Sequence, residues 1–224
     1  MRMIAALRKE PRAAHSSHLD LQRTLQRVFR RAGLPLLYSM GFNPHPLMSF
    51  ATALATGHTS DGEWFEVELE QGFAPKEFLA RANAQMPEGL RVTQAFAAPE
   101  GMPSLTKLLR AAKYELRLYT EVPVARQRAE ETLAALLAQS EVLVAKKTKE
   151  GVKTVNIRPA LLEASLLDAD ETCLTLSVTG ALTASGGLRA ELLAHALLDA
   201  LQCKGWVKAH RSSLCFCGFV PADI

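Results

Sequence analysis

The chain has 224 residues, 48% of them hydrophobic, and its 26 Lys and Arg nearly balance its 23 Asp and Glu. This length can bury a core as one large domain or as two small ones. No run of about 18 apolar residues and no signal-peptide core is present, so we expect a cytoplasmic protein without a membrane partner. The cysteines, Cys173, Cys203, Cys215 and Cys217, all lie in the C-terminal half and predict reduced thiols rather than a disulfide framework.

The first half of the chain is predicted to fold in the order β-α-β-β-α-β. The expected elements are a strand over 1–7, a helix over 17–32, extended segments over 36–38 and 47–53, a strand over 64–70, a helix over 75–86 and a strand over 90–96. Ser17 and Asp20 have the spacing of a capping box, and Gly33 followed by Pro35 ends the first helix. We therefore assign residues 1–98 to one ferredoxin-like unit.

A similar order follows after a predicted linker at residues 99–110, which contains Gly101 and Pro103. The expected elements are a strand over 114–119, a helix over 124–137, extended segments over 142–145 and 152–157, a strand over 174–178, a helix over 188–201 and a strand over 206–210. Residues 111–224 then form a second unit, and the predicted fold class is α+β with two tandem ferredoxin-like (βαββαβ) units.

The first helix has one apolar face and one basic face. Apolar residues recur at helical spacing at Leu21, Leu25, Val28, Phe29 and Ala32. The other face carries Arg23, Arg27, Arg30 and Arg31. Because the apolar face packs against a core, the arginines remain available for an anion, and the pattern predicts binding of a polyanion.

A second basic block lies in a predicted β-hairpin with Gly151 at its tip. Its residues are Lys146, Lys147, Lys149, Lys153 and Arg158. Lysines on a hairpin can contact a phosphate backbone, and an arginine can bind one phosphate through two hydrogen bonds. Lysines also protect an exposed sheet edge from association with other strands, which is the alternative explanation.

Polar residues next to the first helix are candidates for a selective contact. His18 and Asp20 could form an acid–base pair, although Asp20 can equally serve only to cap the helix. In the segment Gly41–Pro46, prolines and a glycine predict a rigid loop that presents Asn43 and His45. The remaining histidines and cysteines lack the usual zinc spacing, so we expect no metal site and no cofactor.

Several of these segments resemble an uncharacterised bacterial family of radical-SAM-linked proteins. The resemblance rests on Ser17-His18-Leu19-Asp20, on Arg30-Arg31-Ala32-Gly33-Leu34-Pro35, on Gly41-Phe42-Asn43-Pro44-His45-Pro46, and on the segments 146–149 and 155–159. It implies a radical SAM enzyme as partner, encoded beside such chains or fused to them. This chain has no Cys-x3-Cys-x2-Cys sequence to hold the cluster of such an enzyme.

These observations predict a non-catalytic, RNA-binding companion of a radical SAM enzyme that modifies RNA. The arginine helix and the lysine hairpin would bind phosphates, while His18, Asn43 and His45 make a more selective contact. One alternative is an enzyme that acts on RNA or on a small substrate through His18, His45 and Asp20. Another is a protein–protein adaptor that docks the enzyme on the lysine hairpin or on the acidic segment 61–70. The oligomeric state is left open.

Overall fold

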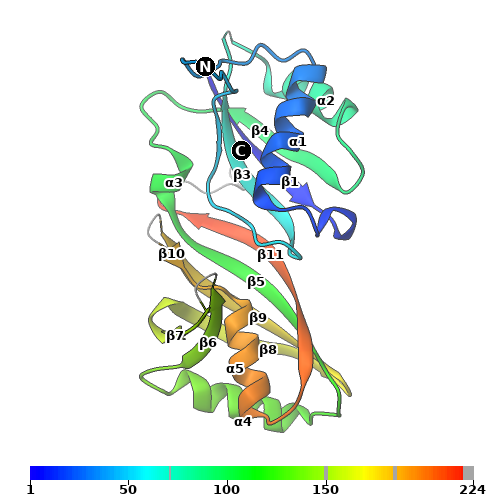
Figure 1. The fold of residues 1–224 in the computed structure, drawn as a ribbon, viewed down its shortest axis with the longest axis vertical. Coiled ribbons are helices and arrows are strands. Elements are labelled where there is room, and N and C mark those ends of the chain that lie inside the picture. Colours follow the sequence, from blue (N-terminus) through cyan, green and yellow to red (C-terminus); the bar gives the residue numbers. More distant parts are fainter. Residues whose placement is uncertain (71, 149–150, 184–185, 219–224) are drawn as a thin grey trace. The chain divides into compact units, whose positions relative to one another are not determined.

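The computed structural model describes residues 1–70, 72–148, 151–183 and 186–218 (Figure 1). The chain divides into two compact units, one made of Met1–Leu109 with Ser213–Ile224 and the other of Arg110–Ser212. Together the described residues contain five α-helices and mostly antiparallel strands, which makes the protein α+β. None of the helices in these residues is long and apolar enough to cross a membrane.

This division differs from the predicted linker at residues 99–110. Helix α3 (Leu105–Leu108) lies within that segment, and Leu105 is fully buried. The backbone N–H of Cys217 donates to the carbonyl of Leu108 at 2.8 Å. The segment is therefore packed structure rather than a free connection, and the last described residues belong to the first unit.

In the first unit, strand β1 (Arg2–Lys9) lies between two antiparallel neighbours, β3 (Thr59–Glu68) and β4 (Leu90–Ala97). The short strand β2 (Met48–Phe50) pairs antiparallel with β3. Phe65 on β3 is in register with Ala5 of β1 and with Phe50 of β2, so β1 and β2 lie on opposite edges of β3. The strand order is therefore β4-β1-β3-β2.

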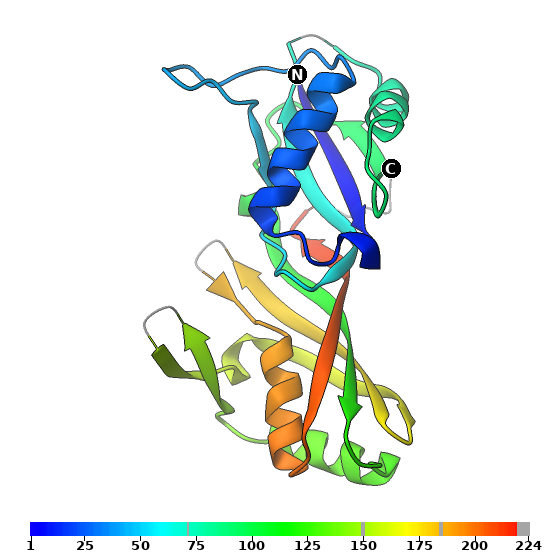
Figure 2. The ribbon, with the colours of Figure 1, turned by 45° about the vertical axis from the view of Figure 1, so that its right-hand side comes forward.

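Helices α1 (His18–Arg31) and α2 (Pro75–Ala84) pack on one face of this sheet (Figure 2). The Phe29 ring of α1 lies 5.8 Å from the Phe65 ring of β3 and 5.4 Å from the Phe78 ring of α2. All three rings are fully buried. Aromatic rings contribute large apolar areas and preferred ring geometries to a core, and this cluster fixes α1 on the sheet.

The ends of α1 match those expected from the sequence. Ser17 Oγ accepts a hydrogen bond from the Asp20 N–H, and the Ser17 N–H donates to Asp20 Oδ2, both at 3.2 Å. This reciprocal pair confirms the predicted capping box. At the other end Gly33 has a φ of +62°, and the Leu34 N–H donates to the Phe29 carbonyl at 3.1 Å. Glycine adopts this left-handed conformation without a steric penalty, so it ends the helix there.

Replacing Ser17 by alanine is expected to lower the free energy of unfolding by about 1 kcal/mol, because the Asp20 N–H loses its acceptor. The hydrogen bonds from Ser17 lower the pKa of Asp20. Because the pKa of Asp20 is lower in the folded chain than in the unfolded chain, its carboxylate stabilises the fold at pH values above the unfolded pKa. This stabilisation is lost as the pH falls through the folded pKa. The difference between wild type and Ser17→Ala in urea unfolding should therefore narrow in acid. Ser17→Thr, which keeps a hydroxyl acceptor, should restore most of the loss, and equal stability of Ser17→Ala at neutral pH would contradict the assignment.

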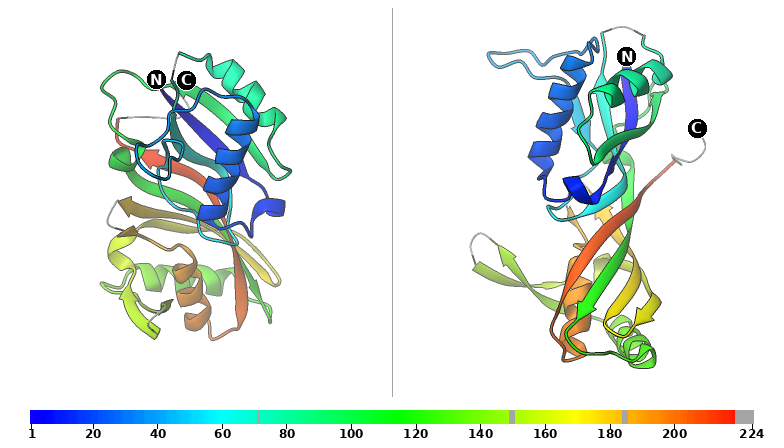
Figure 3. Two further views of the ribbon diagram at one scale, coloured as in Figure 1. Left: turned by 45° about the horizontal axis from the view of Figure 1, so that its top comes forward. Right: turned by 90° about the vertical axis from the view of Figure 1, so that its right-hand side faces the viewer.

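The second unit also combines strands and helices. Its elements are β5 (Leu109–Thr120), α4 (Arg126–Leu137), β6 (Leu143–Thr148), β7 (Gly151–Asn156), β8 (Leu161–Asp170), β9 (Cys173–Thr183), β10 (Gly186–Gly187), α5 (Glu191–Ala200) and β11 (Gly205–Phe216). Strand β9 pairs antiparallel with both β5 and β8, and β11 lies next to β5. Strands β6 and β7 form a separate two-stranded sheet. Figure 3 shows α5 lying against one face of the larger sheet.

Strand β8 has no counterpart in the sequence prediction. Only Leu161 at its start is buried, and the remaining side chains are exposed or half-buried. Because the strand lies at the edge of the sheet, burial does not impose an alternating apolar pattern along it. Its place is decided by antiparallel pairing with β9, from Leu161 opposite Gly180 to Asp170 opposite Cys173.

Candidate nucleic-acid interface

The exposed side of α1 is basic. Arg23, Arg27 and Arg30 are exposed, and within the described residues none of them forms an ion pair. Arg31 is also exposed, but its guanidinium donates to the Gln85 carbonyl at 3.1 Å and so binds α1 to the end of α2. The predicted amphipathic helix is confirmed, because Leu21, Leu25, Val28 and Phe29 are buried on the opposite side. Three guanidinium groups are thus presented together on a fixed helix.

The start of α1 holds Asp20 in a structural role. Besides the capping bonds, Asp20 Oδ2 accepts a hydrogen bond from Ser17 Oγ at 2.6 Å. The His18 ring packs edge-on against Phe50 of β2, with 5.2 Å between ring centroids. His18 is half-buried by this contact, so the ring is fixed on the sheet at the end of β2.

The loop after α1 is a narrow projection (Figure 2). Its base is closed by a bridge between Tyr38 and Pro46 and by a hydrogen bond from the Ser39 N–H to the His45 carbonyl at 2.9 Å. Ser39 Oγ also lies 2.9 Å from His45 Nδ1 and accepts from the His45 N–H at 3.1 Å. These contacts occupy Nδ1 and leave Nε2 of the exposed imidazole as the nitrogen that can meet a ligand. The exposed Asn43 lies on the same loop.

Two apolar side chains at the tip of this loop were not anticipated from the sequence. Met40 and Phe42 are almost fully exposed. A large apolar side chain held in solvent has no folding role, and on a rigid loop it can contact a ligand instead. The available signal was an aromatic residue between Gly41 and Asn43, where turn chemistry favours polar residues.

His18 and His45 lie at different places along β2. His45 precedes the strand, whereas the His18 ring contacts Phe50 at its other end. His45 contacts Ser39 of its own loop, and the Asp20 carboxylate is engaged with Ser17. The described contacts thus engage His18, Asp20 and His45 with different partners, and the enzyme alternative that uses them stays a prediction.

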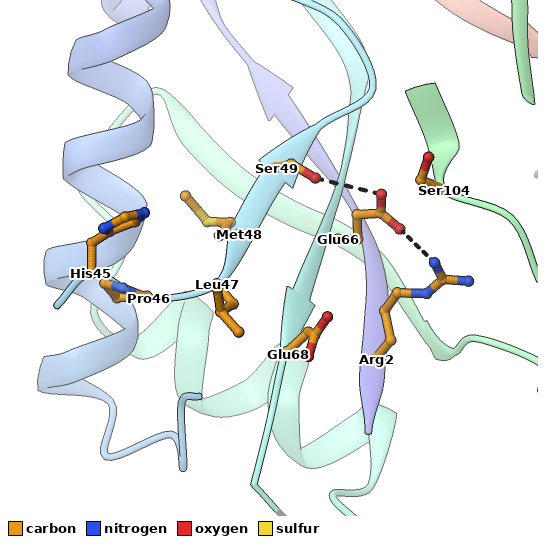
Figure 4. Close-up of a pocket in the computed structure, with 9 residues that line it drawn as sticks. All are labelled: Arg2, His45, Pro46, Leu47, Met48, Ser49, Glu66, Glu68 and Ser104. Carbon is orange, nitrogen blue, oxygen red and sulfur yellow. Dashed lines mark hydrogen bonds and ion pairs between the residues drawn. The ribbon is translucent and has the colours of Figure 1, made fainter. Parts of the chain in front are cut away.

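A cavity of about 330 Å³ lies beside the base of this loop (Figure 4). Its wall includes His45, Ser49 of β2, Glu66 of β3 and Arg2 of β1. The Arg2 guanidinium pairs with Glu66 at 3.3 Å, and Glu66 Oε1 accepts from Ser49 Oγ at 3.4 Å. Glu66 Oε1 also accepts from the backbone N–H of Leu105 at 3.3 Å, while Arg2 donates to the carbonyls of residues 102 and 103. The charged groups of the cavity thus hold the segment before α3 on the sheet.

The acidic segment over residues 61–70 has both buried and exposed carboxylates. Glu63 and Glu66 are both buried, at 1% and 7% exposure. Asp61 forms an ion pair with Arg8 at 3.7 Å. Asp61, Glu68 and Glu70 are exposed, so the adaptor alternative that uses this segment stays a prediction.

Lys9 is buried at the end of β1 beside these carboxylates. It is 1% exposed, and its Nζ donates to the carbonyls of Ala14 at 2.9 Å and Ser16 at 3.0 Å. Burial lowers the pKa of Lys9, and the charge of Glu63 partly opposes that change. Through its two hydrogen bonds, the Lys9 side chain fixes the turn that leads into the capped start of α1. Nothing in the sequence distinguishes this buried lysine from the exposed basic residues near it.

The predicted basic hairpin is present as β6 and β7, with Gly151 starting the second strand. Lys146 and Lys153 are directly opposite each other in the register, so two positive charges lie close together. Like charges on facing positions repel each other, and a bound anion would relieve this repulsion. Lys149 lies outside the described residues, as does the side chain of Lys147. Arg158 donates to the carbonyls of Leu137 and Leu161, both at 3.1 Å, so its guanidinium supports the fold instead of standing free for a phosphate.

The fold and this surface define a class of α+β protein with antiparallel sheets and an exposed basic helix. A family model covers residues 2–189, and the chain belongs to this family, described as an uncharacterized protein conserved in bacteria (DUF2344). No curated protein matches the sequence.

Several solved structures share the fold. A chain in a crystal structure of a Cbf5–Nop10–Gar1 complex matches with a TM-score of 0.57 and 10% identity, over 95% of this chain and 48% of that chain. A chain in an H/ACA RNP bound to a substrate RNA containing 2'-deoxyuridine gives 0.53 and 8%, over 95% and 47%. A chain in the archaeal box H/ACA sRNP Nop10–Cbf5 complex gives 0.52 and 11%, over 95% and 47%. This chain spans about half the length of the chains it matches, and the likeness concerns the fold alone.

Proposed function

We propose that this protein binds RNA as the non-catalytic companion of a radical SAM enzyme that modifies RNA. The observation that carries the proposal is the set of exposed guanidinium groups of Arg23, Arg27 and Arg30, which have no ion-pair partner among the described residues. Guanidinium groups bind phosphates bidentately, and a fixed row of them attracts a polyanion. The loop with Phe42, Asn43 and His45 projects from the end of the same helix and supplies groups for a base contact.

Two further features support this function. The facing Lys146 and Lys153 add a second positive site in the other unit. Two of the solved structures that share the fold are described in their titles as RNP complexes, which makes RNA the first polyanion to test. The radical SAM partner rests on the resemblance of the segments around Ser17, Gly41 and Lys146 to radical-SAM-linked proteins.

We also infer that each unit is ferredoxin-like. The first has the order β4-β1-β3-β2, with a helix after its first strand and another after its third. The second has the order β11-β5-β9-β8, with α4 after β5 and α5 after β9. The hairpin of β6 and β7 is then an insertion that carries the lysines. In such units the face without helices and the connecting loops are available for ligands.

The function is tested by binding of the purified chain to a short unstructured RNA across a salt series, with polyglutamate as a control polyanion. Because phosphate contacts release counterions, log K should fall linearly with log salt, by about 0.7 per contacted phosphate of a single strand. Equal binding of polyglutamate, or no RNA binding at low salt, would contradict the proposal. Co-purification with the radical SAM enzyme that survives nuclease treatment would instead support the adaptor alternative.

A further inference from the structure

The larger sheet of the second unit has one apolar face and one polar face. Along β5, Tyr114, Leu116 and Leu118 are buried, whereas Lys113 and Arg117, which have the opposite parity along the strand, are exposed. Successive side chains of a strand point to opposite faces, so the buried set lies under the helices and the other set faces away from them. Figure 3 shows α5 on a single side of these strands. The face without α5 is therefore polar along most of β5.

This polar face carries an aromatic pair at one end. Tyr119 of β5 and Trp206 of β11 stack with 4.1 Å between ring centroids and an interplanar angle of 12°. Trp206 is nevertheless 51% exposed. Stacking on Tyr119 covers one side of the indole, while half of the Trp206 side chain remains exposed to solvent.

A lysine ammonium stands beside the stacked rings. Lys208 Nζ lies 5.1 Å from the Trp206 centroid and 5.5 Å from the Tyr119 centroid. If the ammonium lay over the outer side of one ring, its distance to the other ring would be longer by about the 4.1 Å that separates the two ring centroids. The two nearly equal distances therefore place the ammonium at the rim of the pair, so it does not cover the outer side of Trp206. Arg117, in contrast, is bound to Glu115 at 2.9 Å.

We propose that the outer side of Trp206 is a stacking site for one unpaired nucleobase, with Tyr119 as backing and Lys208 contacting the adjoining phosphate. This inference rests on the proposed RNA-binding function and assigns it a base-contacting site. Every nucleobase has a flat π-face, so the site would bind single-stranded RNA with little sequence preference. The backing by Tyr119 holds the indole in place before the ligand arrives, which reduces the entropy lost on binding.

The chain provides a direct measurement. It has two tryptophans, and Trp64 is buried in the first unit, so an exposed-indole signal reports on Trp206. A short unstructured RNA should quench this fluorescence, whereas an abasic RNA of the same length should bind by its phosphates without quenching. Trp206→Phe should keep most of the affinity and lose the quenching. Trp206→Ala should bind RNA about 5-fold to 100-fold more weakly. Leu162→Ala, which truncates an exposed apolar side chain on β8, serves as the matched control and should bind as wild type.

The outcomes separate this site from the broader function. Salt-dependent RNA binding without quenching, with Trp206→Ala equal to wild type, would overturn the stacking site and leave the proposed function standing. In that case Tyr119, Trp206 and Lys208 form only a self-contained surface cluster. Absence of RNA binding by the wild-type chain would overturn both. The quenching measurement needs no variant, so it decides the question even if Trp206→Ala fails to fold.

Discussion

Changing Arg23, Arg27 and Arg30 together to alanine is expected to reduce the salt dependence of RNA binding. The three guanidinium groups are exposed, lie on one helix face and form no ion pairs within the described part of the chain. Each phosphate contact with a single strand contributes about 0.7 to the slope of log K against log salt, so losing three should reduce the slope by about 2. Affinity at low salt should fall with it. Fluorescence anisotropy of a labelled RNA, measured at several salt concentrations, gives both quantities.

A matched variant controls for total charge. Arg8, Arg12 and Arg81 are also exposed arginines of the first unit, but they pair with Asp61, Glu88 and Glu77. Changing these three to alanine removes the same charge and leaves the α1 surface intact. Exposed ion pairs contribute little to stability, so both variants should fold like wild type. A slope that falls equally in both variants would show that only net charge matters and would remove α1 from the interface.

The second large effect is expected from Lys9→Met, which should lower the free energy of unfolding by about 3 kcal/mol. The carbonyls of Ala14 and Ser16 lose their ammonium donor. Glu63, buried at 1% exposure, loses the nearby positive charge. Removing one partner from a buried charged pair is costly because the other stays charged in a poorly solvated place. Urea unfolding followed by far-UV circular dichroism measures the difference.

The double variant Lys9→Met with Glu63→Gln tests the cause. If the loss comes from the isolated carboxylate, neutralising Glu63 should recover part of it, so the two changes will not be additive. The pH dependence has a definite sign as well. Burial lowers the pKa of Lys9 below its ordinary value of 10.5, so the unfolded chain holds this proton more tightly. The contribution of Lys9 to stability therefore rises as pH increases from its folded pKa toward 10.5. A Lys9→Met chain as stable as wild type would show that the buried ammonium is not needed.

Elements whose signals are local could be predicted from the sequence. Helix α1 follows from the spacing of Leu21, Leu25, Val28 and Phe29, from the Ser17 cap and from Gly33, because helix periodicity and end chemistry act within a few residues. The arginine face follows from the same periodicity. Strand β8 could not be predicted this way, because an edge strand with little burial carries almost no alternating pattern.

Contacts between side chains from distant segments become visible in the folded chain. It buries Lys9 against the turn before α1, engages Arg158 with backbone carbonyls, and packs His18 against Phe50. It also stacks Tyr119 on Trp206 from distant parts of the chain. The residue type alone does not tell whether a lysine lies in solvent or in a core. Likewise, the sequence of one strand does not specify which distant strand it pairs with. The arginine face of α1 could therefore be predicted from the sequence, because its residues lie on one helix. The pair of Tyr119 and Trp206 could not, because it forms only when two distant strands come together.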